Sequence, residues 1–443
     1  MKRLAFTIVL ALIATLSTFA GDKEIYIPEE LRTIDFDNPA SQWCHAHSRL
    51  TPNFVIFWEQ GFGDDLSCPP DLEGHKMAVD LDNLCERLET FYDYYYNVLQ
   101  FAHAGSLCDK YRMMVMISYS LEGTAYGGDY DGVIGALWVA PNRIQDRALN
   151  CIAHELGHCF QSQITCDGEG EAWGGSGFFE MTSQWMLWQV NPDWIGSETY
   201  HWDAFCKNTH KAYLSFENIY RSPYIIEYWG MKRGLPAIAD LYRAGKRGED
   251  PVITYKRLYQ LSQADFCDEM YDAVCPIVNL DYPRCFDITR PYACRMRTEL
   301  DTLPHGWYAP VETQIPENYG FNVIPLALPR KGHQVKVSFR TSVPASQGSF
   351  RCGFVIVNKD GTSTYSPMQT ITGKAMLKTN VDADADRLFL VVMAAPAEHP
   401  DPARRHRPLD MPDEPVPTIP TDRERPIEAL PEPFAYTFKA AIL

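Results

Sequence analysis

The spacing of hydrophobic and polar residues predicts three strands and a helix in the first third of the chain. The runs at residues 53–58, 111–119 and 132–140 are rich in apolar, β-branched and aromatic residues, a composition that favours strands. Between the first two runs, leucines and tyrosines recur at helical spacing over residues 81–99 and predict an amphipathic helix. The expected order is therefore strand, helix, strand, strand.

A second amphipathic helix is predicted directly after the third strand. An Asn followed by a Gln three residues later, at residues 142–145, resembles a capping box and marks the expected start. Apolar residues repeat at every fourth position from Ala148 to Phe160, whereas His154, His158 and Gln161 fall on a different face. The helix is thus expected to bury one side and to present a separate polar stripe.

Helical patterns continue to about residue 275. Residues 178–188 form an apolar run that predicts a buried helix, and residues 191–275 are typical of further helices. The clearest amphipathic piece among these spans residues 224–243.

From residue 304 onward the pattern changes to short alternating segments, which favour a β-sandwich. The tetrapeptide at residues 358–361, Asn-Lys-Asp-Gly, is a hairpin turn signal. Residues 398–433 are rich in proline and charge and predict a long loop, after which residues 434–443 predict a last strand. The other expected strands are residues 322–328, 334–340, 350–358, 362–365, 378–381 and 387–393.

The polar stripe carries the most informative motif, His154-Glu155-Leu-Gly-His158. Side chains four residues apart on a helix are neighbours, about 5–6 Å apart at Cβ, so both imidazoles can bind one zinc ion. Zinc lowers the pKa of a bound water molecule to about 7, so Glu155 can serve as general base and no protein nucleophile is needed. The motif therefore predicts hydrolysis, most often of a peptide bond.

A catalytic zinc ion needs a third protein ligand and leaves its fourth position to water. Glu169 and Glu171 lie in a glycine-interrupted acidic loop, which would hold a ligand loosely. Glu180 lies in the expected buried helix at residues 178–188, where a carboxylate is costly unless it is paired or bound to metal. Glu180 is therefore the preferred third ligand.

Stabilisation of the transition state requires a hydrogen-bond donor that faces the reacting carbonyl oxygen. The downstream helical segment offers several neutral or cationic donors, among which Tyr224 and His210 are preferred. The full set of candidates is His201, His210, Tyr213, Tyr224 and Tyr228.

This combination of residues resembles the gluzincin-type zinc metallopeptidases, in which a His-Glu-x-x-His helix is followed by a Glu on the next active-site helix. The resemblance implies an α+β zincin-like metallopeptidase domain at residues 21–303, followed by an all-β sandwich domain at residues 304–443. Gluzincins commonly place an Asp four residues after the ligand Glu to orient a zinc histidine. Here that position is Gln184, which can accept a hydrogen bond from the imidazole but carries no charge.

Two other likenesses concern the same region. The sequence from His154 to Gln161 resembles the His-Glu-x-x-His-x-x-Gln motif of plant basic secretory proteins, which adds Gln161 to the expected surroundings of the metal. Residues 53–63, 153–158, 179–186 and 391–396 resemble a family of uncharacterised secreted bacterial and fungal proteins, known only as a domain of unknown function. That resemblance implies no substrate.

The gluzincin resemblance also implies where a substrate would bind. In that fold the strand directly before the zinc helix lies at the edge of the sheet, over the cleft, where an extended peptide can pair with it as an added strand. The corresponding strand here is at residues 132–140. Gly135, Ala136 and Leu137 are therefore the expected contacts for the substrate backbone.

Composition limits the class and location of the protein. A chain of 443 residues that is 46% hydrophobic can bury a large core, and a formal charge of -17 disfavours nucleic acid and anionic membranes as partners. Residues 1–20 have the pattern of a cleaved signal peptide, which predicts a secreted, periplasmic or envelope protein without a transmembrane anchor. Thirteen cysteines in an exported protein suggest local disulfides. The expected cluster is Cys267, Cys275, Cys285 and Cys294.

The preferred interpretation is an exported zinc-dependent endopeptidase with His154, His158 and Glu180 as ligands and Glu155 as general base. One alternative is a binding protein with a structural zinc site, whose sandwich binds a glycan or an envelope protein; Glu155 argues against it, because a structural site needs no base. The other is a zinc amidase that acts on cell-wall or glycoprotein substrates.

Overall fold

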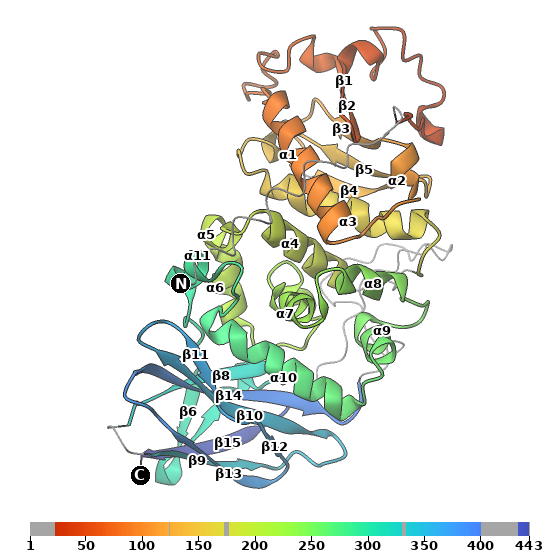
Figure 1. Cartoon of the computed structure of the whole chain (residues 1–443). Coiled ribbons are helices and arrows are strands. Elements are labelled where there is room, and N and C mark those ends of the chain that lie inside the picture. The colour runs from red at the N-terminus through yellow and green to blue at the C-terminus, as the bar shows by residue number, and fades with distance from the viewer. Residues whose placement is uncertain (1–22, 124, 172–176, 330–333, 400–432, 443) are drawn as a thin grey trace, which may run out of the picture.

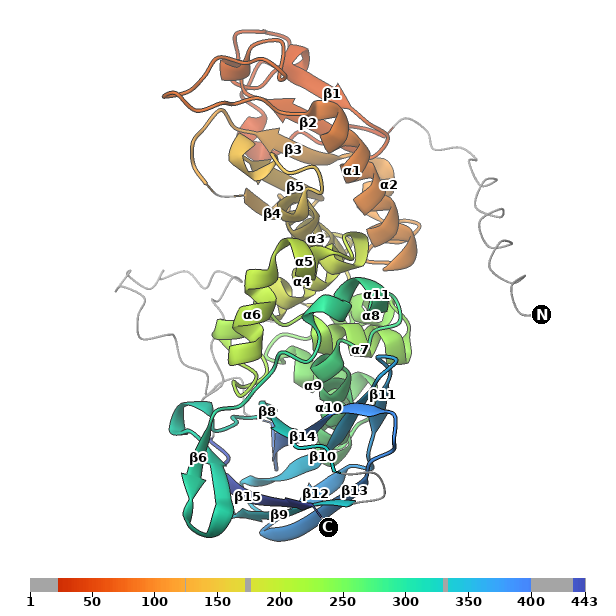
Figure 2. The same cartoon turned by 90° about the vertical axis from the view of Figure 1, so that its left-hand side faces the viewer.

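The computed structural model describes residues 23–123, 125–171, 177–329, 334–399 and 433–442. The expected signal peptide at residues 1–20 and nearly all of the expected loop at 398–433 lie outside these ranges. The fold is mixed α+β. A five-stranded sheet occupies one end of the molecule, two further sheets occupy the other end, and helices fill the middle (Figures 1 and 2).

The first sheet contains the three predicted strands as a parallel core. They are β2 (Phe54–Trp58), β3 (Met113–Ile117) and β5 (Ile134–Val139), and the short β1 (Ser48–Leu50) adds to one side. On the other side lies β4 (Ala125–Tyr130), antiparallel to β5, so the order is β1-β2-β3-β5-β4. The glycine-rich sequence of β4 was not recognised as a strand, and β4, not β5, forms this edge.

Helix α1 (Leu81–Asp93) continues as a π-helical turn, η5 (Tyr94–Val98), so the predicted helix at residues 81–99 is confirmed. The motif helix α3 (Asn150–Cys166) starts later than expected. The sequence taken for its capping box forms a separate 3-10 turn, η6 (Pro141–Arg143), and Leu149 precedes α3 in a left-handed conformation with φ of 52°.

Helix α4 (Phe178–Val190) packs along α3. The expected helix at residues 224–243 is divided into α7 (Tyr224–Arg233) and α8 (Ala237–Arg243), because Gly234, with φ of 93°, ends the first one and Pro236 precedes the second. The other α-helices are α2 (Leu107–Lys110), α5 (Trp194–Ser197), α6 (Thr199–Lys207), α9 (Pro251–Leu258), α10 (Gln263–Asn279) and α11 (Phe286–Thr289). The remaining 3-10 helices are η2 (Glu29–Leu31), η3 (His45–His47), η4 (Gln60–Phe62), η7 (Phe216–Asn218), η8 (Arg290–Tyr292), η9 (Pro304–Gly306) and η10 (Glu312–Gln314).

The C-terminal strands form two facing sheets that share a hydrophobic core. The turn predicted at residues 358–361 joins β10 to β11. The first sheet has the order β11-β10-β14-β8, with β12 also paired to β10; these strands are β8 (Phe321–Leu326), β10 (Gly348–Asn358), β11 (Ser363–Tyr365), β12 (Gln369–Ile371) and β14 (Ala385–Pro396). The second has the order β13-β9-β15-β7-β6, comprising β6 (Leu300–Leu303), β7 (Trp307–Pro310), β9 (Gln334–Thr341), β13 (Lys374–Asn380) and β15 (Tyr436–Ile442).

Helix α10 joins these sheets to the helical middle of the molecule. It lies across β10 and β14 (Figure 1), and its buried residues belong to the same hydrophobic cluster as Val355, Val391 and Met393. The hairpin β6–β7 spans the expected domain boundary between residues 303 and 304. The strand-rich part therefore begins before that point.

The expected local disulfides were wrong. All thirteen cysteines are free thiols, and Cys267, Cys275, Cys285 and Cys294 are buried. Burial raises the pKa of Cys275 to about 12, which is typical of an inert core thiol. Among the described residues, no helix combines the length and hydrophobicity needed to cross a membrane.

Candidate metal centre

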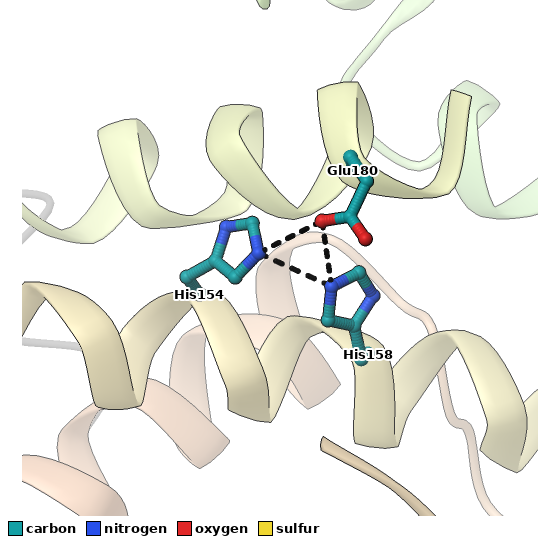
Figure 3. Close-up of side chains that lie close together, drawn as sticks. All are labelled: His154, His158 and Glu180. Carbon is teal, nitrogen blue, oxygen red and sulfur yellow. Dashed lines mark hydrogen bonds and ion pairs between the residues drawn. The ribbon is translucent and has the colours of Figure 1, made fainter. Parts of the chain in front are cut away.

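Two closely packed helices carry the candidate centre. His154 and His158 project from α3, and Glu180 projects toward them from the first turn of α4 (Figure 3). The helices approach closely at Gly157, where an added Cβ would lie 2.5 Å from the Ser183 Oγ of α4. That hydroxyl donates a hydrogen bond to the His154 carbonyl. The approach fixes the two ligand-bearing faces against each other.

Three side-chain atoms converge between these helices. His154 Nε2 and His158 Nε2 are 3.1 Å apart, and Glu180 Oε2 lies 3.1 Å from the first and 3.2 Å from the second. His154 is 8% exposed, and 26% of the Glu180 side chain is exposed. The three residues therefore form a partly covered cluster that could hold a metal ion.

Two glutamine side chains fix the tautomer of each histidine. Gln184 Nε2 donates to the Tyr220 carbonyl at 2.7 Å, and Gln161 Nε2 donates to the Phe179 carbonyl at 3.0 Å. Each amide oxygen must therefore face its histidine, because a reversed amide would place oxygen against a carbonyl oxygen. His154 Nδ1 lies 3.0 Å from Gln184 Oε1, and His158 Nδ1 lies 3.0 Å from Gln161 Oε1.

This arrangement makes each Nδ1 a donor. In a neutral imidazole the other nitrogen then carries a lone pair, so two lone pairs and a carboxylate oxygen meet within hydrogen-bonding distance. Such a group of acceptors is repulsive unless a positive charge, from protons or a metal ion, lies among them. The donor set, two imidazole nitrogens and one carboxylate oxygen, matches what zinc takes from proteins.

The pKa shifts have the same origin. Burial alone would raise the pKa of Glu180, but its hydrogen bonds and ion pairs with His154 and His158 outweigh burial and lower it. Burial would lower the pKa of His158, but the contact with Glu180 outweighs it and raises the pKa. The lowered pKa of Glu180 and the raised pKa of His158 both mean that the site favours positive charge between the three side chains.

Glu155 is oriented by the edge strand β4. Its Oε2 accepts a hydrogen bond from the Gly127 N–H at 2.8 Å. A Cβ at Gly127 would lie 1.9 Å from the Glu155 carbonyl oxygen, so only glycine permits β4 to approach α3 this closely. The carboxylate of the motif is thus anchored to the strand edge, and its charge also acts on His158.

Tyr220 is a site residue that the sequence did not reveal. Its ring centroid lies 6.0 Å from that of His154, its hydroxyl is hydrogen-bonded to Glu180, and the residue is 44% exposed. Burial, followed by the charge and hydrogen bond of Glu180 and the charge of Glu155, raises the pKa of Tyr220, so the phenol keeps its proton near neutral pH. It follows the 3-10 turn η7, where no helical periodicity singles it out.

The two preferred oxyanion donors lie elsewhere. Tyr224 is fully buried, packed against Trp188, Trp202 and Phe205, so the expectation for it was wrong. His210 is 5% exposed, and its carbonyl accepts from the Glu317 N–H near the strand-rich part; no contact among the described residues links it to the metal cluster.

The other candidates also have separate surroundings. The Tyr213 hydroxyl is buried, Tyr228 lies beneath Lys232, and His201 Nε2 lies 3.4 Å from Glu198 Oε2. Glu169 is paired with His103 and Arg243, and Glu171 accepts a hydrogen bond from the Arg247 backbone. Neither acidic-loop residue joins the cluster.

The expected substrate strand was wrong. Gly135, Ala136 and Leu137 are buried in β5, which pairs with β3 on one side and β4 on the other. The Gly135 N–H also donates to Gln163 on α3. The backbone of β5 is therefore already paired, and the edge strand on this side of the sheet is β4.

Comparisons with known proteins place most of the chain in one family. The profile described as "Family of unknown function (DUF6055)" matches residues 17–412, which agrees with the resemblance expected from the sequence. A search of curated proteins finds no match to the chain.

Similar solved structures are distant. The M60 catalytic domain of Clostridium perfringens ZmpC, solved with the sialyl T antigen, is 11% identical over 82% of this chain and 71% of that chain, with a TM-score of 0.31. The C-terminal family 22 carbohydrate-binding module of Clostridium thermocellum Xyn10B is 13% identical over 33% of this chain and 82% of that chain, with a TM-score of 0.20. The CBM22-1 xylan-binding domain of Paenibacillus barcinonensis Xyn10C is 10% identical over 33% and 96%, with a TM-score of 0.17. These scores are too low to carry an argument about fold or ligand.

Proposed function

The chain belongs to this family, DUF6055, and we propose that it is a zinc-dependent hydrolase of peptide bonds. The observation that carries the proposal is the convergence of His154 Nε2, His158 Nε2 and Glu180 Oε2, with both histidine tautomers fixed by glutamines. Three protein ligands leave the fourth position of a tetrahedral zinc ion to water, which distinguishes a catalytic from a structural site. A zinc ion held there supplies Lewis-acid polarisation and lowers the pKa of water to about 7.

Glu155 is the proposed general base. A structural metal site has no use for a carboxylate beside its ligands, whereas hydrolysis needs a group that takes a proton from water and delivers it to the leaving amine. The hydrogen bond from Gly127 holds the Glu155 carboxylate at the edge of β4 and limits its rotation. Preorganisation of this kind reduces the reorganisation needed during proton transfer.

Tyr220 is the proposed hydrogen-bond donor to the oxygen of the tetrahedral transition state. It is the phenol in contact with Glu180, it is partly exposed, and its raised pKa keeps the donor proton in place. A neutral donor aimed at developing negative charge typically contributes about 10²–10³ in rate.

The edge strand β4 is the proposed contact for the substrate backbone. The Gly127 N–H that reaches Glu155 points away from β5, and in an antiparallel strand the backbone groups two residues away point the same way. Ala125, Gly127 and Asp129 therefore present the outer edge of β4. An extended peptide added there would pass beside Glu155, and this favours a polypeptide substrate.

Peptide-library profiling by mass spectrometry tests the proposal. We expect the purified, zinc-loaded protein to cleave a subset of peptides and Glu155→Gln, which keeps the ligands, to bind equal zinc without cleavage. A parent protein that holds one zinc ion per chain and cleaves no peptide would overturn the peptidase assignment and favour the amidase alternative, tested next with cell-wall fragments and glycopeptides.

A second candidate function concerns the strand-rich part. An open groove of about 340 Å³ lies between β11 and β13, lined by Asn358, Tyr365, Lys378, Asn380 and other polar residues. Amides, a lysine and a 40%-exposed tyrosine are groups that bind sugar hydroxyls and ring faces. We infer glycan binding there, and retardation of the chain in polysaccharide-containing gels, compared with Tyr365→Ala, tests it.

A further inference from the structure

Gln184 spans two parts of the candidate centre. Its amide oxygen accepts from His154 Nδ1 at 3.0 Å, and its amide nitrogen donates to the Tyr220 carbonyl at 2.7 Å. The residue is 3% exposed, as expected for a polar group whose hydrogen bonds are satisfied within the protein. One rigid amide therefore links the orientation of a metal ligand to the backbone position of the tyrosine beside it.

The segment that bears Tyr220 is also held at its base. Ile219 packs against Gly177 at the start of α4, where a Cβ would lie 2.1 Å from the isoleucine side chain, and Asn218 donates to the Asn208 carbonyl. These contacts hold the base of the segment, whereas the Gln184 amide reaches the carbonyl of Tyr220 itself. Tyr220 lies two residues after the 3-10 turn η7, in a turn outside any helix.

A second glutamine, Gln161, links the other histidine to a backbone carbonyl in the same way. Gln161 accepts from His158 Nδ1 and donates to a backbone carbonyl, as Gln184 does, but its acceptor is Phe179 in the first turn of α4. Gln161 is 2% exposed and Gln184 is 3% exposed. The two glutamines thus have the same chemistry toward the metal site and differ in the segment that each one holds.

We propose that Gln184 is a positioning residue that holds Tyr220 over the metal site, whereas Gln161 acts on the ligand helices alone. The proposal rests on the proposed function, because it assigns Tyr220 a task in the reaction. A carboxylate at this position, as in the gluzincin resemblance, could orient His154 equally well but has no N–H for the Tyr220 carbonyl. The amide is therefore the feature that allows one side chain to perform both tasks.

The substitution Gln184→Glu separates the two tasks, because it keeps an acceptor for His154 and removes the donor to Tyr220. We expect the variant to bind one zinc ion per chain and to lose about 10- to 100-fold in kcat, the range seen when partners of active-site ligands are changed. Tyr220→Phe should lose about 10²-fold. The double variant should be no slower than Tyr220→Phe alone, because both changes remove the same contribution.

Gln161→Glu is the control for this double-mutant cycle of Gln184→Glu and Tyr220→Phe. Its effect on kcat should combine with that of Tyr220→Phe multiplicatively, because Gln161 does not hold the tyrosine segment. Multiplicative losses for Gln184→Glu and Tyr220→Phe would overturn the proposal.

A second readout does not depend on turnover. With 3-fluorotyrosine placed at residue 220, the ¹⁹F resonance of the metal-free and zinc-loaded proteins should shift or broaden in Gln184→Glu and stay at its parental position in Gln161→Glu. An unchanged resonance in Gln184→Glu would overturn the coupling, even if no peptide substrate is found. A changed resonance in a protein without peptidase activity would support the coupling and contradict the proposed function. If Gln184→Glu does not fold, the neutral and shorter Gln184→Asn replaces it.

Discussion

At the scale of single residues, the side chains that hydrogen-bond the two histidines of the candidate centre are uncharged. With neutral histidines, the carboxylates of Glu155 and Glu180 balance the two positive charges of a zinc ion. Gln161 and Gln184 orient the histidines without changing that balance. A carboxylate in place of either amide would add a buried negative charge, which is costly without another partner. Neutral amides therefore combine orientation with charge balance.

Zinc binding should stabilise the folded chain through Glu180. A ligand at 100 times its Kd stabilises the native state by about 2.7 kcal/mol, and a chelator should remove this gain. Glu180→Gln keeps the shape of the side chain but removes its charge, so most of the zinc-dependent rise in melting temperature should disappear. Glu171→Gln, a substitution of the other candidate ligand, should retain it. Thermal melts with zinc or chelator provide the measurement, and an unchanged rise in Glu180→Gln would contradict the ligand set.

The sequence allowed some site residues to be predicted and not others. His154, His158 and Glu180 carry periodic and compositional signals, since they interrupt otherwise apolar helices. Tyr220 carries none, because its position depends on the tertiary contacts of an irregular turn. Tyr224 and His210 were misjudged for the related reason that residue type indicates a possible donor but does not show which way a side chain faces.

At the scale of elements, the close contact between β4 and α3 determines the site geometry. The strands with apolar runs were predictable, but β4 was not, because two glycines and an aspartate lower its strand propensity. Gly127, one of these glycines, is nevertheless required there, because a side chain at this position would collide with the backbone of α3. Consequently, the edge strand was assigned to β5, and the substrate contacts were expected one strand away from where the edge lies.

Gly127 should tolerate no side chain. Its Cβ would meet the backbone of Glu155 at 1.9 Å, and a backbone atom cannot rotate away, so Gly127→Ala should lower the free energy of unfolding by about 1–3 kcal/mol and reduce turnover by displacing Glu155. Gly128→Ala is the matched control, because its nearest neighbour is the edge of the exposed Tyr126 ring at 3.3 Å. Denaturant titration and activity assays of both variants test this; equal effects would argue against the role of the β4–α3 contact.

At the scale of the whole molecule, the sandwich is more than an appended module. Its strands followed the predicted spacing, but sequence periodicity could not reveal that α10 covers one face of the first sheet. The consequence is visible in β14, which is buried along almost its entire length because helix and facing sheet cover both sides. One hydrophobic cluster extends from β2 through α10 to β14.

This shared core predicts cooperative unfolding. Calorimetry of the intact, metal-free chain should give one transition whose van't Hoff and calorimetric enthalpies agree, because separating the sheets from α10 would expose core residues of both parts. A fragment ending at residue 303 should fail to fold alone for the same reason. Two resolved transitions, or a folded fragment, would show that the two parts are independent.

The most direct test of the metal centre is diffraction from crystals of the zinc-loaded protein, with anomalous data collected at the zinc absorption edge. One anomalous peak is expected about 2.0–2.2 Å from His154 Nε2, His158 Nε2 and Glu180 Oε2, the distances typical of zinc ligands. Gln161 and Gln184 should keep their hydrogen bonds to the Phe179 and Tyr220 carbonyls in the same crystals. A peak at other residues, or none between α3 and α4, would contradict the proposed metal centre and with it the proposed hydrolase.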